Sequence, residues 1–467
     1  MAPAVVEPRR RARRILATLL ALAAAACGDA TGPGDRDLLE RLNALPGVRA
    51  VEIQPYYGYA RAFQLDVTQP VDHRDPSGAT FTQRAYLSHA DEDAPMVFGA
   101  YGYGATETSG EEMATFLQGN GLYVTHRYFP GSRPEPADWR YLDVWQAATD
   151  HHRIVGLLKE IYGGVWVSAG ASKSGMTPLF HRRFYPDDVR ATVAYVAPLM
   201  FSLGDPRFPP HVASLGTAEG RERIHAFQQR LLEHQDTLLP LFEAWFRRSG
   251  LELGVPAGPV FEGEVASYEW GFWQRHVYDY GQIPGPDAPH QVWIDHLGLV
   301  TRAHFASDTW RDYFKAYVYQ LYTELGSPGQ DLSHLEGLFR HEGLDPRDEY
   351  DFPAALPLDW DDGAAMRDVA DWIRARGERI VLVYGGVDPW TGGAIDVGGN
   401  ASVLKVVQPG ADHQVRILDL PQRDAVLAAL SEWTGVPLTA VPAGALRVEA
   451  PEPELAVRMG VLHTRLR

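Results

Sequence analysis

Three residues whose side chains can together carry out nucleophilic catalysis stand in loops that follow predicted strands. Ser172 comes directly after an apolar segment, in the run Gly-Ala-Ser-Lys-Ser-Gly, and Asp388 and His413 each follow a later strand. A serine at a tight strand-to-helix turn is held clear of the sheet, and its neighbours must be small. A hydroxyl nucleophile needs a base and a carboxylate that orients the base. We therefore assign Ser172 as nucleophile, His413 as general base and acid, and Asp388 as the orienting carboxylate.

Two other carboxylates compete with Asp388 for this role. Asp412 is adjacent to His413, and neighbouring side chains on an extended chain point apart, which makes it a poor partner. Asp396 lies further along its loop. The serine turn, taken alone, is also typical of a plain helix cap.

An oxyanion forms when a serine attacks a carbonyl, and backbone N–H groups usually stabilise it. One donor should be the amide of Lys173, the residue after the nucleophile. The loop Gly102-Tyr103-Gly104 follows an earlier strand and is the expected source of the second, from Gly102 or Tyr103. An ordinary glycine-rich turn is the alternative.

The elements that must position these residues alternate between short apolar strands and amphipathic helices. Strands are expected within 48–68 and over 81–87, 94–100, 122–126, 165–168, 193–196, 379–384 and 402–407, and helices over 141–162, from 173, and over 422–434. Between 201 and 360 strand patterns vanish, and helices are expected over 218–248, 307–325 and 331–340. This order predicts an α/β-hydrolase fold, a mostly parallel sheet with a helical cap inserted between the nucleophile and acid strands.

The expected organisation has six parts. They are a lipoprotein signal peptide (1–26), a tether (27–45), the first part of the core (46–200), the helical cap (201–360), the second part of the core (361–436) and a C-terminal tail (437–467).

Composition narrows the class of protein. The 467 residues are 45% hydrophobic, which is ample for a sizeable core, and the formal net charge is −17. Such an acidic chain is not expected to bind nucleic acid. We also expect no cofactor and no metal.

The N-terminus indicates export. Five arginines within residues 9–14 precede an apolar run over 15–26, which is too short for a permanent membrane span and typical of a signal peptide. Cys27, the only cysteine, follows three alanines, as in a bacterial lipobox where the cysteine is acylated. We expect a protein lipid-anchored to a bacterial membrane, outer membrane or cell surface, or else secreted, with membrane contact only through lipid. An ordinary signal peptide with a chance cysteine is the alternative.

Several stretches together resemble one family. The segment around Ser172 is similar to the Gly-Gly-Ser-Lys-Gly-Gly-Met-Thr of secreted bacterial tripeptidyl aminopeptidases, serine peptidases related to lysosomal prolyl carboxypeptidase and dipeptidyl peptidase II. Further matching stretches, in the same order between about 50 and 435, are 69–73, 80–84, 126–129, 132–134, 146–152, 268–274, 322–326 and 388–390. The resemblance implies an α/β-hydrolase core with a helical cap and release of short peptides from free N-termini, often after proline.

The chain departs from the family pattern at three positions. Ala171 and Ser174 replace glycines at the serine turn, and Thr125 stands where the family has a glutamate before His-Arg-Tyr-Phe. If that glutamate helps to hold the substrate ammonium, Glu269 or Glu324 could serve instead, because a desolvated ammonium needs a carboxylate. Both could equally be solvated or structural.

Aromatic residues of the predicted cap and of the acid loop could form an apolar substrate pocket. Trp273 and Trp390 are the candidates, with Trp270 and Phe272 nearby, and packing within the cap is the alternative role. Arg127 and Arg133 are expected to support loops near the site.

The sequence thus predicts an extracytoplasmic serine exopeptidase whose partners are peptides with a free N-terminus and which releases tripeptides or other short peptides through an acyl-enzyme. A carboxylic-ester hydrolase with the same triad and a catalytically silent surface lipoprotein are the alternatives.

Overall fold

The computed structural model describes residues 33–56, 58–275 and 279–438. The predicted signal peptide, Cys27 and most of the predicted C-terminal tail lie outside the described residues.

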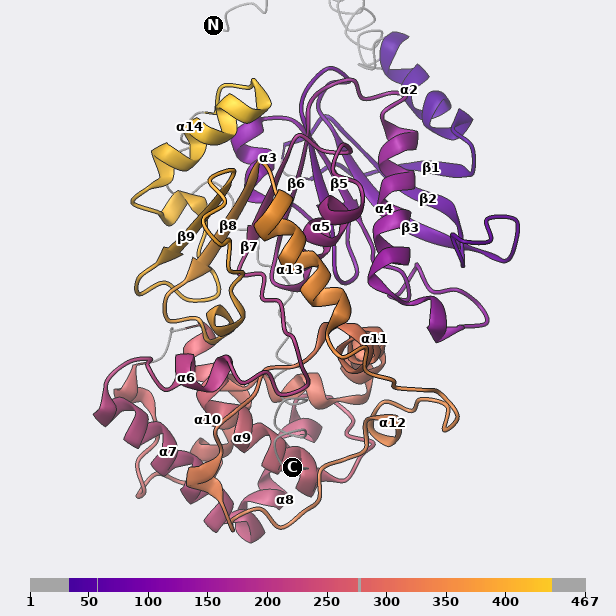
Figure 1. Ribbon diagram of the computed structural model, residues 1–467. Helices are drawn as coiled ribbons and strands as arrows, with labels where there is room; N and C mark the ends of the chain where they lie inside the picture. Colours follow the sequence, from indigo (N-terminus) through magenta and orange to yellow (C-terminus); the bar gives the residue numbers. More distant parts are fainter. Residues whose placement is uncertain (1–32, 57, 276–278, 439–467) are drawn as a thin grey trace, which may run out of the picture.

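A nine-stranded sheet with strand order β1-β2-β3-β5-β4-β6-β7-β8-β9 forms the centre of the molecule (Figure 1). The strands are β1 (Val48–Ile53), β2 (Arg61–Pro70), β3 (Thr80–His89), β4 (Met96–Ala100), β5 (Asn120–Val124), β6 (Trp166–Ala171), β7 (Ala191–Tyr195), β8 (Ile380–Gly385) and β9 (Val403–Gln408). Strands β1, β2, β3 and β5 pair antiparallel, and every pairing from β5 to β9 is parallel. The parallel strands are almost continuously apolar because helices cover both of their faces.

Helices cover the sheet on both faces. On one face lie α2 (Pro33–Ala44), α4 (Val144–Leu158), α5 (Lys173–Phe184) and α13 (Ala364–Arg376), and on the other α3 (Glu112–Leu117) and α14 (Arg423–Thr434). Buried side chains of α5 and α13, such as Leu179 and Ile373, pack with Leu382 of β8. Phe116 of α3 and Leu430 of α14 pack behind the same strands. The elements that carry the predicted triad are therefore fixed by core packing on two sides.

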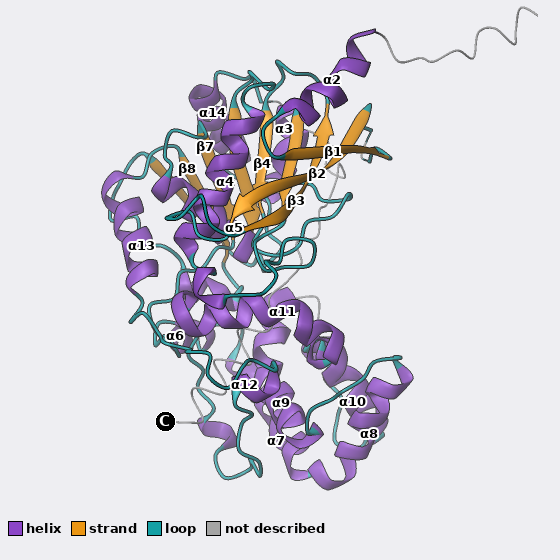
Figure 2. Ribbon diagram, turned by 90° about the vertical axis from the view of Figure 1, so that its right-hand side faces the viewer, coloured by secondary structure: helices purple, strands orange, loops and turns teal. Residues whose placement is uncertain are grey.

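A helical cap is inserted between β7 and β8 and extends from one end of the sheet (Figures 1 and 2). Its helices are α6 (Phe208–Val212), α7 (Ala218–Glu233), α8 (Gln235–Arg248), α9 (Ala257–Arg275), α10 (His290–Val300), α11 (Asp308–Gln320) and α12 (Pro346–Glu349), with a π-helical turn at Leu321–Leu325. The cap has its own apolar core, to which Phe227, Phe242, Tyr268 and Trp293 contribute. Helix α9 is buried over most of its length, which explains why its apolar residues do not keep to one face.

Three local expectations need correction. The segment predicted as part of a tether is helical over Pro33–Ala44, because Leu38 and Leu42 are four residues apart and both are buried against the sheet. Only a short turn, Ser333–Leu335, forms where a helix over 331–340 was expected. The run 218–248 is two helices, α7 and α8, which meet at His234.

Within the described part of the chain, no helix combines the length and the apolar character that a membrane crossing requires.

Candidate active site

Ser172 occupies a strained turn between β6 and α5. Its backbone has φ 58° and ψ −130°, a conformation that non-glycine residues rarely adopt. The turn is tight, since a Cβ on Gly170 would lie 1.8 Å from the carbonyl oxygen of Ser174. The Ser172 amide donates to the carbonyl of Tyr195 in β7, at 2.9 Å. The serine is thus held at the carboxyl end of a parallel strand, where active sites of open α/β sheets gather.

Hydrogen bonds connect Ser172, His413 and Asp388 in a chain. His413 Nε2 lies 3.0 Å from Ser172 Oγ, and His413 Nδ1 lies 2.7 Å from Asp388 Oδ2. All three side chains are buried. In the tautomer that fits both contacts, Nδ1–H donates to the carboxylate and Nε2 accepts from the hydroxyl. The imidazole is then ready to remove the serine proton.

The two rival carboxylates have other partners. Asp396 is exposed and pairs with Arg374 at 3.1 Å. Asp412 Oδ1 accepts the amide proton of Gln414 at 2.9 Å. Asp388 caps the short helix Pro389–Gly393, and its Oδ1 accepts from the Trp390 amide at 3.1 Å, which aims Oδ2 at His413.

Two cap residues that the sequence did not single out also hold this chain in place. The His413 amide donates to the carbonyl of Gln274, at the end of α9, at 3.0 Å. His211 of α6 contacts the Asp388 carbonyl oxygen through Nε2 at 2.9 Å. Because both contacts use backbone groups of His413 and Asp388, the cap helps to position the predicted triad. No motif signals such contacts, since they depend on how the cap docks.

The predicted oxyanion donors lie side by side. The Lys173 amide is at the start of α5, where helix N–H groups point outward without intrahelical partners. Gly102 packs directly against Lys173, since a Cβ on Gly102 would lie 2.7 Å from Lys173 Cγ. The Gly102 amide donates to Ser174 Oγ at 3.0 Å, so of the two loop amides we favour that of Tyr103 as second donor.

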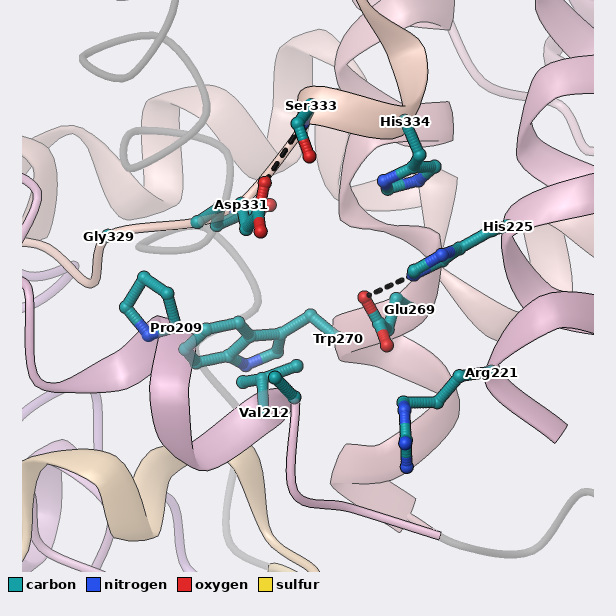
Figure 3. Close-up of a pocket in the computed structure, with 12 residues that line it drawn as sticks. Pro209, Val212, Arg221, His225, Glu269, Trp270, Gly329, Asp331, Ser333 and His334 are labelled. Atoms are coloured by element: carbon teal, nitrogen blue, oxygen red, sulfur yellow. Dashed lines mark hydrogen bonds and ion pairs between the residues drawn. The ribbon is translucent and has the colours of Figure 1, made fainter. Parts of the chain in front are cut away.

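A pocket of about 190 Å³ opens between α6, α7, α9 and the segment 329–334 (Figure 3). Glu269 and Trp270, both on α9, line it together with Asp331. Trp270 stacks edge-on against Trp390 with ring centres 5.1 Å apart, and Trp390 lies 6.2 Å from the ring of His413. The pocket is therefore two aromatic rings away from the predicted base.

Charged and polar groups meet in this pocket. Figure 3 shows His225 directed at Glu269, with 3.3 Å between His225 Nε2 and Oε2. The rings of His225 and His334 are stacked 3.7 Å apart. Burial and the nearby His225 lower the pKa of His334 to about 4, whereas the hydrogen bonds from Ser333 lower the pKa of Asp331. At neutral pH the pocket thus contains an ionised Asp331 and a neutral His334.

Two of the predicted substrate residues are in other surroundings. Trp273 is buried within the cap, where its ring packs against Phe272 and Tyr280. Glu324 accepts the Val144 amide proton at 2.8 Å and so caps the start of α4. Burial and the adjacent Asp143 raise the pKa of Glu324 well above its ordinary value. These contacts give both residues structural roles, whereas Glu269 lines the pocket and Trp390 lies beside His413.

Thr125, which stands where the family has a glutamate, and the nearby Arg127 and Arg133 also support the site. Thr125 Oγ1 accepts the Ala105 amide proton at 3.0 Å, which holds the far end of the glycine-rich loop. Arg127 is fully buried and forms two hydrogen bonds to Asp150, at 2.7 and 2.8 Å. Arg133 donates to the Tyr128 carbonyl at 3.2 Å. Arg127 and Arg133 thus hold backbone and helix α4 in place.

No group of three or more His, Cys, Asp or Glu side chains that could hold a metal ion occurs among the residues that the structure describes.

The strand order and the strained serine after β6 define a hydrolase of the α/β-hydrolase class, which confirms the expected fold. A family model described as PS-10 peptidase S37 matches residues 31–452. The chain therefore belongs to the S37 family of serine peptidases, and the resemblance to tripeptidyl aminopeptidases is confirmed.

Known relatives agree with this membership. The chain is 34% identical over 449 residues to a prolyl tri/tetrapeptidyl aminopeptidase of Streptomyces mobaraensis, covering 93% of this chain and 94% of the relative. Among solved structures, a proline iminopeptidase of Mycobacterium smegmatis shares 14% identity at a TM-score of 0.40, covering 79% of this chain and 98% of that one. Acetyl xylan esterase 1 of Thermoanaerobacterium sp. JW/SL YS485 shares 12% identity at a TM-score of 0.35, covering 87% and 96%. The chain is thus a serine aminopeptidase by family.

Proposed function

We propose that this protein is an extracytoplasmic exopeptidase that releases tripeptides or other short peptides from free N-termini, with Ser172, His413 and Asp388 as its triad. The observation that carries the proposal is the hydrogen-bond chain of 3.0 and 2.7 Å through His413. Membership of a serine peptidase family supports it.

Acylation begins when His413 Nε2 takes the Ser172 proton and Oγ attacks the scissile carbonyl. The charge that develops on the carbonyl oxygen is stabilised by the amides of Lys173 and Tyr103. Asp388 stabilises the imidazolium, which then gives its proton to the departing amine as the peptide C–N bond breaks.

Deacylation uses the same groups in reverse. His413 removes a proton from water, the resulting hydroxide attacks the acyl carbonyl, and the Ser172 Oγ–acyl bond breaks. The proton returns to Oγ, the short peptide leaves as a carboxylic acid, and the enzyme is restored.

Recognition of the free N-terminus is assigned to the pocket that Glu269 and Asp331 line. A peptide ammonium carries a positive charge near neutral pH, and it needs an anionic partner once it leaves water. Glu269 is mostly buried, with its side chain 14% exposed, so its contact with an ammonium would be little screened by solvent.

The position of this pocket fits a short acyl group. Centroid steps of 5.1 and 6.2 Å lead from Trp270, which lines the pocket, through Trp390 to His413. Three extended residues span about 10 Å. We infer that a tripeptide with its carbonyl at Ser172 reaches this pocket with its ammonium, and the activity named for the Streptomyces relative is consistent with this length.

The proposed location rests on the N-terminal sequence. The arginines at 9–14, the apolar run over 15–26 and Cys27 indicate export and acylation of the cysteine. Cys27→Ser should move the protein from the membrane fraction to the soluble fraction of cells that process lipoproteins. Equal membrane recovery of both forms would refute the lipid anchor.

A panel of peptides with free and acetylated N-termini, analysed by product mass, tests the activity. The proposal predicts short N-terminal products, mostly of three residues, from the free peptides and little cleavage of the acetylated ones. Equal rates on both would indicate an endopeptidase, and turnover of acyl esters alone would indicate an esterase.

Glu269→Gln tests the ammonium site, with Glu243→Gln on the surface of α8 as the matched control. Because hydrogen bonds to charged groups contribute about 1.5 to 3 kcal/mol, the change should lower kcat/KM for free peptides by roughly 10- to 150-fold. Cleavage of acetylated peptides should stay as slow as before. If Glu269→Gln behaves like Glu243→Gln, the ammonium binds elsewhere.

A further inference from the structure

The side chain of Lys173 is buried between the serine turn and the glycine-rich loop. Its Nζ donates to the carbonyl oxygen of Gly102. Three aromatic rings surround Nζ, with centres 5.1 Å away for Tyr103, 5.0 Å for Phe129 and 5.2 Å for Tyr317. Lys173 forms no ion pair with the residues that the structure describes, and burial lowers its pKa well below the ordinary value. A methionine would fill the same space without the cost of burying an amine, so the hydrogen bond to Gly102 is what the lysine adds.

A second side chain of the serine turn holds the other polar group of Gly102. Ser174 Oγ accepts the Gly102 amide proton at 3.0 Å. Two consecutive residues thus bind both the C=O and the N–H of one glycine. One turn later in α5, Thr177 Oγ1 donates to the carbonyl of Ala100, which anchors the start of the same loop.

These contacts determine how the next peptide group is oriented. A trans peptide is planar, so its N–H points opposite to its C=O. Because Lys173 Nζ holds the carbonyl of Gly102, it also sets the direction of the Tyr103 N–H in the same peptide plane. The close packing of Gly102 on Lys173, where an added Cβ would lie 2.8 Å from the Lys173 carbonyl carbon, prevents the loop from moving inward.

We propose that the Lys173 side chain and the Ser174 hydroxyl are positioning groups that clamp the Gly102–Tyr103 peptide, so that the Tyr103 amide is pre-aligned for the oxyanion. This inference rests on the proposed triad and oxyanion hole. It gives Ser174, where this chain departs from the glycine of the family pattern, a specific role. Tyr317 belongs to α11, so the clamp also connects the oxyanion loop to the cap.

Lys173→Met tests the clamp because it keeps the length and apolar contacts of the stem and removes the donor. We expect kcat to fall about 100- to 1,000-fold, as when one oxyanion donor is lost, with KM within about threefold. Affinity for a peptide aldehyde, whose adduct carries an oxyanion-like oxygen, should fall by the same factor as kcat/KM. Inhibition by the tripeptide product should be unchanged. Active sites are counted by fluorophosphonate labelling carried to completion, so that misfolded protein does not contribute.

The matched control is Lys315→Met. Lys315 Nζ also donates to a backbone carbonyl, that of Asp351, and lies 5.3 Å from the centre of the Phe352 ring, but on the cap. This control should retain full kcat. If loss of a lysine lowered kcat only by disturbing packing, kcat would fall in both Lys173→Met and Lys315→Met.

Ser174→Ala provides a milder test that does not depend on the folding of Lys173→Met. Loss of one neutral hydrogen bond should lower kcat about 2- to 10-fold. In combination with Lys173→Met the two effects should be less than multiplicative, because both act on Gly102.

Two results would overturn the clamp. One is a kcat of Lys173→Met within threefold of the wild type, and the other is a loss fully explained by fewer labelled active sites. If instead wild-type Ser172 fails to react with the fluorophosphonate, the proposed triad itself is wrong.

Discussion

Asp388→Asn is the substitution for which the structure predicts the most specific failure. Both carboxylate oxygens have hydrogen-bond donors as partners, since Oδ1 accepts from the Trp390 amide at 3.1 Å and Oδ2 accepts from His413 Nδ1 at 2.7 Å. An asparagine has only one acceptor oxygen on its amide. The Trp390 amide cannot change into an acceptor, so it will take that oxygen, and the NH₂ group will face His413.

The consequence is that the imidazole of His413 adopts the opposite tautomer. With an NH₂ donor beside it, Nδ1 must accept, so the ring proton moves to Nε2 and points at Ser172 Oγ, now 3.0 Å away. A protonated Nε2 cannot remove the serine proton. A base held in the wrong tautomer lowers kcat by about 10⁴-fold, and KM should change little because the substrate contacts are untouched.

Steady-state kinetics on a free tripeptidyl substrate measures this loss. Asp396→Asn and Asp412→Asn are the controls, since both alter rival carboxylates in the same region. Both controls should retain near wild-type rates. The predicted change of tautomer is refuted if Asp388→Asn stays within tenfold of the wild type, or if Asp412→Asn causes the larger loss.

Two further predictions concern stability. Arg127→Met should destabilise the fold by about 3 to 5 kcal/mol, because it removes the guanidinium from the buried Asp150 carboxylate and leaves His73 Nε2, at 2.7 Å, as its side-chain partner. Arg140→Met, at an exposed ion pair, should leave the stability nearly unchanged. Urea unfolding of both variants checks this, and similar losses would contradict the role of burial. Burial raises the pKa of Glu349 to about 7, although Arg311 opposes the shift. Ionisation of Glu349 in the folded state therefore lowers the free energy of unfolding as the pH rises from about 4.5 through 7. Glu349→Gln should consequently be about 1 to 3 kcal/mol more stable than the wild type at pH 8 and equal to it at pH 4. The same unfolding measurement at the two pH values checks it, and a stability difference independent of pH would be contrary to this reasoning.

Much of the hydrolase core could be predicted from local patterns. Short apolar strands and the Gly-Ala-Ser-Lys turn identify themselves because burial on both faces and a tight turn restrict the residues that fit. The order of Ser172, Asp388 and His413 along the chain was sufficient to nominate them, since each follows a strand and parallel strands end at one edge.

The contacts that the cap makes could not be predicted from local patterns in the same way. Trp273 was expected to contact substrate, but an aromatic residue on a helix buried on most sides gives no signal of which neighbour it faces. The pocket around Glu269 brings together His225 of α7 with Asp331 and His334 of the segment 329–334, and no spacing in the sequence relates these segments to α9. Ser174 was visible only as a departure from the family pattern, and its partner Gly102 is 72 residues away.

Helix α2 was missed for a different reason. Glycine and aspartate before Leu38 are typical of a flexible tether, and the helix is stabilised mainly by packing of Leu38 and Leu42 on the sheet.

The most direct test of the proposed triad is to locate the fluorophosphonate adduct by mass spectrometry of the digested protein while measuring peptide release. We expect an adduct on Ser172, and a loss of peptide release on the order of 10⁶-fold in Ser172→Ala. An adduct on another serine, or peptide release by Ser172→Ala at more than a trace of the wild-type rate, would contradict the proposed triad.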